Sequence, residues 1–291
     1  GIAERMFKNF PEIFSTENGR ECFVFSRSTT VPRCILSMAA NNERLKELNP
    51  KIKIERDAAK RFSYLNNAYK NADRDSINKV SKQFLIDHFD VQKFVHSIFT
   101  DTAYANKVIV DQPAFVSNLY YVVADAKDLD HLKISMEDIF TPDEFFNLWQ
   151  ASNIKLYLVF TSKVAKDSSK KLLRNILDCA ESAIKNKNIS ADLRFGHDSY
   201  ISPLLTLMNI EGTYAVENNP EKVYEKWCDF KVTPMAVNLQ MVFYRNEKSD
   251  DILVKLLHNE KEVSIPIKTD IAPYYKWNDV KNYYEKIIAE K

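Results

Sequence analysis

The 291 residues are 45% hydrophobic and 28% charged, as in ordinary globular proteins, but they include only four glycines, which are isolated from one another. A P-loop, a dinucleotide-binding G-x-G-x-x-G and a G-x-S-x-G nucleophile elbow each need two or three closely spaced glycines, so these sites are excluded. The net charge of +1 creates no overall field that attracts nucleic acid, and no apolar run approaches the roughly 18 residues of a membrane span.

The first part of the chain predicts a helix, a strand and a second helix. Residues 1–14 carry apolar side chains at three- and four-residue spacing, which is typical of one helix face. Cys22–Ser26 is a short aromatic and β-branched run that predicts a buried strand. Val31–Leu48 predicts a helix, with Thr30 as its N-cap and Pro32 in its first turn, where the missing N–H costs nothing.

Between residues 66 and 153 the pattern changes to amphipathic helices separated by polar turns. The stretches with helical spacing are Ile77–Phe89, Val91–Phe99, Phe115–Ala124 and Asp143–Trp149. Few runs of period two occur there. The sequence therefore predicts a helical insertion subdomain over residues 66–153.

The rest of the chain returns to mixed structure. The expected strands are Ile154–Phe160, Ala191–Phe195, Met235–Tyr244, Ile252–His258 and Val263–Ile267, the last three at one edge of a sheet. The expected helices are Ser169–Lys185, Tyr200–Asn209 and Trp277–Ala289. Strand–helix alternation on both sides of a helical block predicts an α/β core, formed by residues 1–65 and 154–291, that the insertion interrupts.

The four cysteines give no sign of a metal site. Cys22, Cys34, Cys179 and Cys228 include no C-x-x-C pair, which argues against structural zinc and thioredoxin-like redox chemistry. The sequence leaves open whether any two of them form a disulfide.

Two segments share a design in which a short strand runs through polar residues into a helix. Ligands of open α/β sheets bind at the carboxyl ends of strands, and helix N-termini attract anions. In the first segment Arg27 stands at the strand end, where its guanidinium can hold a phosphate or a carboxylate; alternatively it pairs with a neighbouring acid. Arg33, within the following helix, is a weaker candidate for anion binding, and its position favours a structural ion pair.

The second segment is Leu193–Tyr200, in which Gly196 stands directly before His197 and Asp198. A glycine at a strand end indicates an unusual backbone angle or the close approach of a ligand. At a helix start, His197 can donate a hydrogen bond to a phosphate and Asp198 can donate a proton. Alternatively, His197 is a histidine with its hydrogen bonds made within the protein, and Asp198 caps the helix. Together with Arg27 they predict an anion site with a carboxyl group next to it.

Arg27-Ser-Thr-Thr-Val-Pro-Arg33 followed by Ser37, and later Gly196-His197-Asp198, resemble the second and third signature segments of the histidine acid phosphatases. The resemblance is to the branch with phytases and multiple inositol polyphosphate phosphatases, and it is best over residues 1–215. It implies a three-layer, phosphoglycerate-mutase-like core and a phosphorylated small molecule as substrate. It also implies no cofactor or metal and a periplasmic or secreted location.

The family's mechanism assigns roles to these residues. A nucleophilic histidine takes the phosphoryl group, and water hydrolyses the resulting phosphohistidine. By the match, Arg27 and His197 bind phosphate, with Arg33 a weak addition, and Asp198 protonates the leaving oxygen. Many polyphosphate-type relatives have His-Ala-Glu at this place, so His197-Asp198 is closer to the acid phosphatases and the fungal or bacterial phytases.

The family's first signature, Arg-His-Gly-x-Arg-x-Pro, carries the nucleophile and has no match in this sequence. None of the five histidines precedes a glycine; they are His88, His96, His131, His197 and His258. We therefore expect a chain without the nucleophile segment that releases no phosphate by itself. Two alternatives stay open: a complete, non-catalytic phosphate-binding or interaction protein on the same fold, and a plain α/β protein whose motifs are caps and ion pairs. The particular substrate and the oligomeric state are also open.

Overall fold

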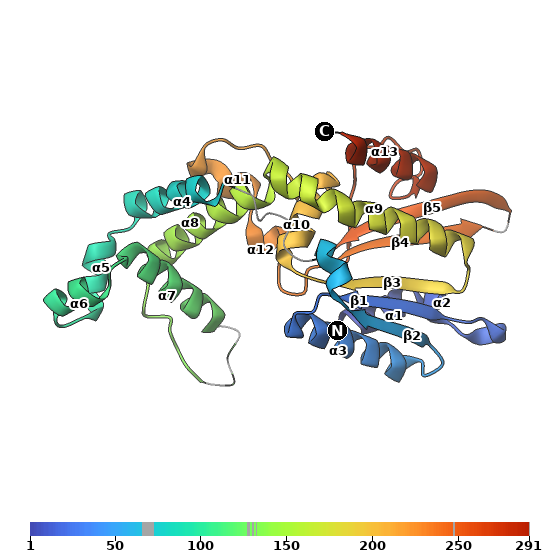
Figure 1. Cartoon of the computed structure of the whole chain (residues 1–291), viewed down its shortest axis with the longest axis horizontal. Coiled ribbons are helices and arrows are strands. Elements are labelled where there is room, and N and C mark those ends of the chain that lie inside the picture. Colours follow the sequence, from blue (N-terminus) through green and yellow to red (C-terminus); the bar gives the residue numbers. More distant parts are fainter. Residues whose placement is uncertain (66–72, 127–128, 130, 132, 247, 291) are drawn as a thin grey trace. The chain divides into compact units, whose positions relative to one another are not determined.

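The computed structural model describes every residue except 66–72, 127–128, 130, 132, 247 and 291 (Figure 1). The chain divides into two compact units, which we call the α/β unit and the helical unit. The α/β unit comprises Gly1–Lys70, Phe160–Tyr214 and Val232–Lys291, and the helical unit comprises Asn71–Val159 and Ala215–Lys231.

A three-stranded parallel sheet organises the α/β unit. Its order is β2-β1-β3, with β1 spanning Phe23–Ser28, β2 Lys53–Ala58 and β3 Ile189–Phe195. Because both neighbours run parallel to β1, the carboxyl ends of the three strands meet at one edge. The register places Arg27 beside Asp57 of β2 and beside Arg194 of β3.

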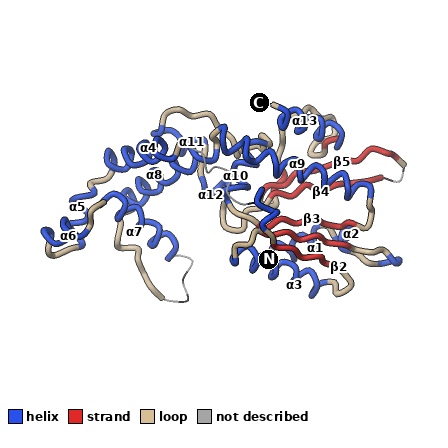
Figure 2. The backbone as a smooth tube through the Cα atoms, viewed as in Figure 1, coloured by secondary structure: helices blue, strands red, loops and turns tan. Residues whose placement is uncertain are grey.

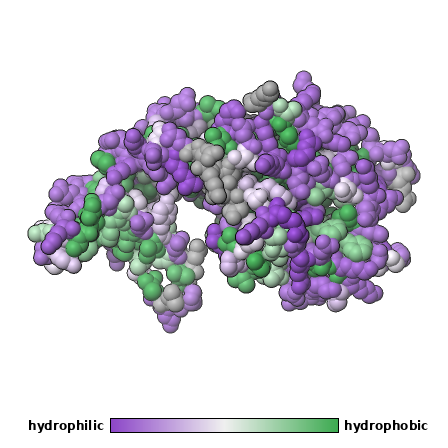
Figure 3. All heavy atoms as spheres, viewed as in Figure 1, coloured by the Kyte–Doolittle hydropathy of each residue, from purple (hydrophilic) through white to green (hydrophobic). Residues whose placement is uncertain are grey.

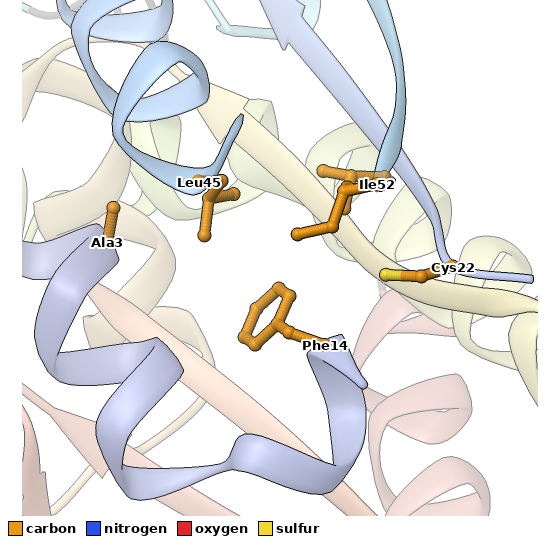
Figure 4. Close-up of a cluster of buried hydrophobic side chains, with 6 residues drawn as sticks. Ala3, Phe14, Cys22, Leu45 and Ile52 are labelled. Atoms are coloured by element: carbon orange, nitrogen blue, oxygen red, sulfur yellow. The ribbon is translucent and has the colours of Figure 1, made fainter. Parts of the chain in front are cut away.

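Helices cover the sheet, and strand alternation decides which side chains face them. On one side lie α1 (Ile2–Asn9), α2 (Pro11–Phe14) and α3 (Pro32–Leu48). They contribute to a buried apolar cluster, shown in Figure 4, of Ala3, Phe14, Cys22, Val24, Leu45 and Ile52. Ser26 of β1 faces the same side and donates from Oγ to Asn42 Oδ1 of α3 at 2.7 Å. Arg27, the next residue, therefore projects from the opposite side of the sheet.

The opposite side of the sheet meets α9 (Lys163–Lys185), and β3 continues through two residues into α10 (Asp198–Leu207). Arg194 Nη2 donates to Asn175 Oδ1 of α9 at 2.8 Å. A second, antiparallel sheet completes the unit, and Figure 2 shows the strands of both sheets in red. It contains β4 (Leu239–Asn246), β5 (Ser249–His258), β6 (Lys261–Glu262) and β7 (Tyr275–Lys276), and α13 (Trp277–Ala289) packs against β5.

Aspartate N-caps begin several helices of the helical unit. Its principal helices are α4 (Arg74–His88), α5 (Val91–Ile98), α6 (Thr102–Val108), α7 (Gln112–Ala126) and α8 (Pro142–Phe160). Asp73, Asp90 and Asp101 precede the first three, and each carboxylate accepts a hydrogen bond from a backbone N–H three residues further on. Such N-caps satisfy donors that the helix leaves unpaired. Hydrophobic spheres gather on this unit in Figure 3, and α6 and α7 contribute the exposed Tyr104, Val108, Tyr121 and Val122.

Several expectations about secondary structure were wrong. Ile154–Phe160 is the last part of α8, because a short apolar run fits a buried helix as well as a strand. Val263–Ile267 is not a strand, and β4 begins at Leu239 rather than at Met235. The C-terminal strands, expected at one edge of a sheet, form a separate sheet of β4, β5, β6 and β7. Thr30 does not cap α3: the N-cap is Val31, and it is Thr29 Oγ1 that accepts from Val31 N at 3.3 Å.

The units do not follow the predicted domain limits at every point. Residues 154–159 and 215–231, expected in the core, group with the helical unit. The buried Asn153 explains part of this, since its Nδ2 donates to Trp227 O at 3.0 Å and its Oδ1 accepts from Asp229 N at 2.9 Å. Whether residues 1–65 with 154–291, and residues 66–153, are separate domains stays a prediction.

Two further short helices are α11 (Val223–Lys226) and α12 (Asp229–Val232), and 3₁₀ turns span Glu17–Gly19, Lys60–Leu65 and Pro220–Lys222. All four cysteines are free thiols. Within the described ranges, no helix has the length and apolar character needed to cross a membrane.

Candidate functional site

The two motif segments lie side by side at the carboxyl edge of the parallel sheet (Figure 1). Thr29 N, just beyond β1, donates to Phe195 O at the end of β3 at 3.3 Å. This bond joins the start of the first motif loop to the start of the second. The strand register therefore brings together residues that are about 165 positions apart in the sequence.

His197 is the centre of this cluster and occupies the N-cap position of α10. Its Nδ1 lies 3.2 Å from Arg33 Nη2, and its Nε2 lies 3.4 Å from Thr29 Oγ1. The Sγ atom of Cys34 lies 3.7 Å from Nε2 and donates to Gly196 O at 3.2 Å. The pKa of His197 is lowered because partial burial and the nearby Arg33 charge both disfavour the imidazolium, and the Asp198 carboxylate opposes them.

Asp198 is the first residue of α10 and is exposed. Its Oδ1 accepts from Ser199 N at 2.7 Å. The aspartate next to His197 is therefore within the first turn rather than at the N-cap. A carboxyl group at such a place can exchange a proton with solvent or with a bound molecule.

Arg27 forms an ion pair on the side of the sheet that faces α9. Its Nη1 donates to Asp192 Oδ1 at 2.5 Å, and Arg194 Nη1 approaches the same oxygen at 2.9 Å. Burial alone would lower the pKa of Arg27, but the hydrogen bond and charge of Asp192 raise it overall. Pairing with a neighbouring acid was one of the two readings of Arg27, and this pairing is observed. Among the side chains that the structure describes, Arg33 is the arginine in contact with His197.

Gly196 is explained by packing rather than by an unusual backbone angle. Its φ is not positive, so that half of the expectation was wrong. A Cβ atom at this position would lie 3.1 Å from Leu65 O, closer than side chains ordinarily approach. The close neighbour of Gly196 is thus the backbone of the Lys60–Leu65 turn.

The other four histidines lie away from this cluster, on the surface or in the core. His88 contacts Phe84 O and Glu221, His96 Nε2 contacts Asn106 Oδ1 at 3.1 Å, and His131 is exposed. His258 is buried against Val232 O at 2.8 Å.

Sequence reasoning missed four residues of the site: Thr29, Cys34, Asp192 and Arg194. Thr29 stands inside the first motif segment and Cys34 directly follows it, but their orientation depends on the turn between β1 and α3. Asp192 and Arg194 had a usable signal, because residues two apart on a strand share a face. In the part of the chain that is described, no cluster of three or more His, Cys, Asp or Glu side chains is arranged to hold a metal ion.

Residues 13–259 match the family model described as the histidine phosphatase superfamily (branch 2). The chain belongs to this superfamily. The family and the α/β fold class with an inserted helical part, both expected from the sequence, are confirmed. The sequence has no significant match among curated proteins.

Solved structures of histidine phosphatases share the fold at low sequence identity. The phytase from D. castellii superposes with a TM-score of 0.65 at 17% identity, covering 99% of this chain and 62% of its own. The multiple inositol polyphosphate phosphatase of Bifidobacterium longum, in complex with inositol hexasulfate, gives 0.73 at 16% identity, with 98% and 77% covered. Its phosphate complex gives 0.66 at 15% identity, with 99% and 78% covered. This chain thus spans less than two thirds of the phytase.

Proposed function

We propose that this chain carries the phosphate-binding and proton-donating half of a phosphomonoesterase of the histidine acid phosphatase type. The observation that carries the proposal is the contact of Arg33 with His197 at the carboxyl edge of the sheet, beside the exposed Asp198. Arginine and histidine at a strand edge suit a phosphoryl group, whose equatorial oxygens need nearby positive charge. A phosphorylated small molecule is the proposed substrate class.

Each side chain has a proposed role. His197 and Arg33 hold the phosphoryl oxygens, and Arg27 contributes positive charge from the neighbouring strand. Asp198 gives its proton to the alkoxide that leaves, which makes the departing alcohol a better leaving group. The charge on these oxygens grows as the ester bond breaks, so the cationic groups stabilise the transition state more than the bound ester.

The proposed covalent step needs a nucleophile in addition to these groups. In a phosphohistidine route the imidazole attacks phosphorus as the ester oxygen leaves, and a water molecule then displaces the histidine. No histidine of this sequence stands in an Arg-His-Gly motif. The proposal therefore assigns the nucleophile to a segment outside these 291 residues and expects no turnover from this chain alone.

Titration calorimetry with inorganic phosphate tests the binding half of the proposal. His197→Ala should weaken binding by about 10- to 100-fold, because it removes a charge-assisted hydrogen bond. His96→Ala is the matched control, since this half-buried histidine belongs to the helical unit. Equal affinity of the wild type and His197→Ala would contradict the site assignment.

Hydrolysis of a generic phosphomonoester tests the catalytic half. The chain alone should release no phosphate, whereas a longer form that includes an Arg-His-Gly segment should turn over and lose about 100-fold or more with Asp198→Asn. Turnover that survives both His197→Ala and Asp198→Asn would sink the mechanism. A non-catalytic phosphate-binding protein is the second candidate, and phosphate binding without turnover in the longer form would favour it. A periplasmic or secreted location stays an expectation from the family.

A further inference from the structure

The contact between Arg33 and His197 favours one tautomer of the neutral imidazole. A guanidinium group has only donors, so His197 Nδ1 must be the acceptor in the 3.2 Å contact with Arg33 Nη2. An accepting Nδ1 carries no proton. The histidine is then neutral, with its proton on Nε2, which faces Thr29 Oγ1 at 3.4 Å.

The groups around the ring agree with this tautomer. Thr29 Oγ1 also accepts from Val31 N at 3.3 Å, so its oxygen is turned toward donors. The Cys34 thiol donates to Gly196 O, and its sulfur, which is a weak acceptor, lies 3.7 Å from His197 Nε2. Asp198, on α10, is the acidic group whose charge favours the imidazolium.

Protonation of His197 changes the relation between the two side chains. The imidazolium presents N–H groups at both ring nitrogens, so Nδ1–H would face the Arg33 donor at 3.2 Å with two like charges side by side. An oxyanion placed between them removes the conflict, because two of its oxygens can accept from the two cations. The same pair is thus a hydrogen-bonded couple without an anion and a two-cation clamp with one.

We infer that Arg33 and His197 form a proton-linked oxyanion clamp, in which binding of a tetrahedral oxyanion is coupled to uptake of one proton by His197. The inference rests on the proposed function, because it uses the same site. It adds that Arg33 keeps the His197 imidazole neutral in the free site, and that a lower pH and a bound anion each favour protonation of His197. Partial burial and the Arg33 charge, which lower the pKa of the free imidazole, act in the same direction.

Linkage gives the size and sign of the effect. Where free His197 is neutral and bound His197 is charged, each bound anion takes up one proton, and the affinity rises by about tenfold for each unit that the pH falls. Sulfate is the suitable probe, because its charge stays constant over the range in which histidine titrates. We expect this rise between about pH 8 and about pH 5, levelling off once free His197 is protonated.

Titration calorimetry of the whole chain with sodium sulfate, in buffers with different ionisation enthalpies, counts the protons directly. We expect uptake approaching one proton per sulfate above the pKa of free His197. His197→Asn should abolish both the uptake and the pH dependence, and Arg33→Gln should weaken sulfate binding by about tenfold or more. His96→Asn, in the helical unit, is the control and should behave as the wild type.

A second measurement does not depend on affinity. The ¹⁵N shifts of the His197 ring in the sulfate-free protein should show an unprotonated Nδ1 at neutral pH. The pKa of His197 read from these shifts should rise in Arg33→Gln, which removes the neighbouring positive charge. A protonated Nδ1 in the neutral ring would overturn the inference. So would sulfate binding without proton uptake, proton uptake that persists in His197→Asn, or no sulfate binding at any pH.

The two proposals fail separately. Proton-linked sulfate binding without hydrolysis by the longer form would leave the clamp standing and remove the phosphatase assignment. Hydrolysis together with pH-independent sulfate binding would leave the phosphatase assignment standing and overturn the clamp.

Discussion

Asp192→Asn should destabilise the α/β unit more than the loss of a carboxylate from an exposed ion pair does. Asp192 Oδ1 binds Arg27 Nη1 at 2.5 Å and Arg194 Nη1 at 2.9 Å, while the side chains of Arg27, Asp192 and Arg194 are only 23%, 15% and 15% exposed. The substitution keeps the shape of the side chain but removes its charge. Two arginines that lie opposite one another in the β1–β3 register then face each other without the carboxylate.

The expected loss follows from these contacts. Breaking a fully buried ion pair costs about 3–5 kcal/mol, chiefly because a charge is left uncompensated. Partial exposure of the three side chains reduces this figure. The amide oxygen of asparagine also keeps one hydrogen bond to an arginine, and a hydrogen bond to a charged group contributes about 1.5–3 kcal/mol. We therefore expect the free energy of unfolding of the α/β unit to fall by about 2–3 kcal/mol.

Native-state hydrogen exchange at the amides of β1 and β3 measures this loss within the α/β unit alone. Asp167→Asn is the matched control, because the Asp167 side chain, which pairs with Lys163 and Lys170, is 39% exposed and its loss should cost less than about 0.5 kcal/mol. Adding Arg27→Met to Asp192→Asn should restore part of the stability, because it removes one uncompensated charge. A loss below about 0.5 kcal/mol for Asp192→Asn, or a double variant no more stable than the single one, would refute the reasoning.

Three further substitutions test other parts of the structure. Gly196→Ala should cost about 1–3 kcal/mol in urea unfolding and weaken phosphate binding, because the new Cβ meets Leu65 O at 3.1 Å and the His197 loop has to shift; unchanged stability and binding would show that the loop yields freely. Asn153→Leu should cost about 2–3 kcal/mol and open residues 215–231 to limited proteolysis, because it removes the bonds to Trp227 O and Asp229 N; a protected segment would contradict this. Burial lowers the pKa of His258, so the unfolded chain binds a proton at a higher pH than the folded chain, and the free energy of unfolding should fall as the pH drops below about 6.5. His258→Asn should reduce the difference between urea midpoints measured at neutral and at mildly acidic pH, and an unchanged difference would exclude His258 as its cause.

Local sequence signals predicted most of the helices and the strands that lead to the site. Trp277–Ala289 was predicted within its observed bounds, because amphipathic spacing continues over the whole helix. β2 was missed, since Lys53–Ala58 lies at the sheet edge and carries charged residues at four of its six positions. Ile154–Phe160 was assigned to the wrong class, because only the packing of α8 in the helical unit distinguishes a buried helix end from a strand.

At the site, the sequence did not reveal which arginine contacts His197. The motifs identified Arg27, Arg33 and His197, but sequence spacing does not say which arginine reaches the histidine. Strand alternation decides it: Ser26 faces α3, so Arg27 faces α9 and meets Asp192, whereas Arg33 lies in the first turn of α3, within reach of the loop after β3. That orientation follows from the pairing of β1 with β3, which no local pattern encodes.

The two arginines consequently differ in their electrostatic state. Arg27 shares Asp192 with Arg194, so these three side chains carry one net positive charge, and the guanidinium groups are held in place by the carboxylate. Arg33 is exposed, and its contact with His197 involves a neutral group that any oxyanion can replace. An anion that reaches this edge of the sheet therefore gains more from Arg33, which it can bind without breaking an ion pair, than from Arg27. On this argument Arg33→Gln should weaken phosphate binding more than Arg27→Gln does, and the reverse order would mean that Asp192 gives way to the ligand.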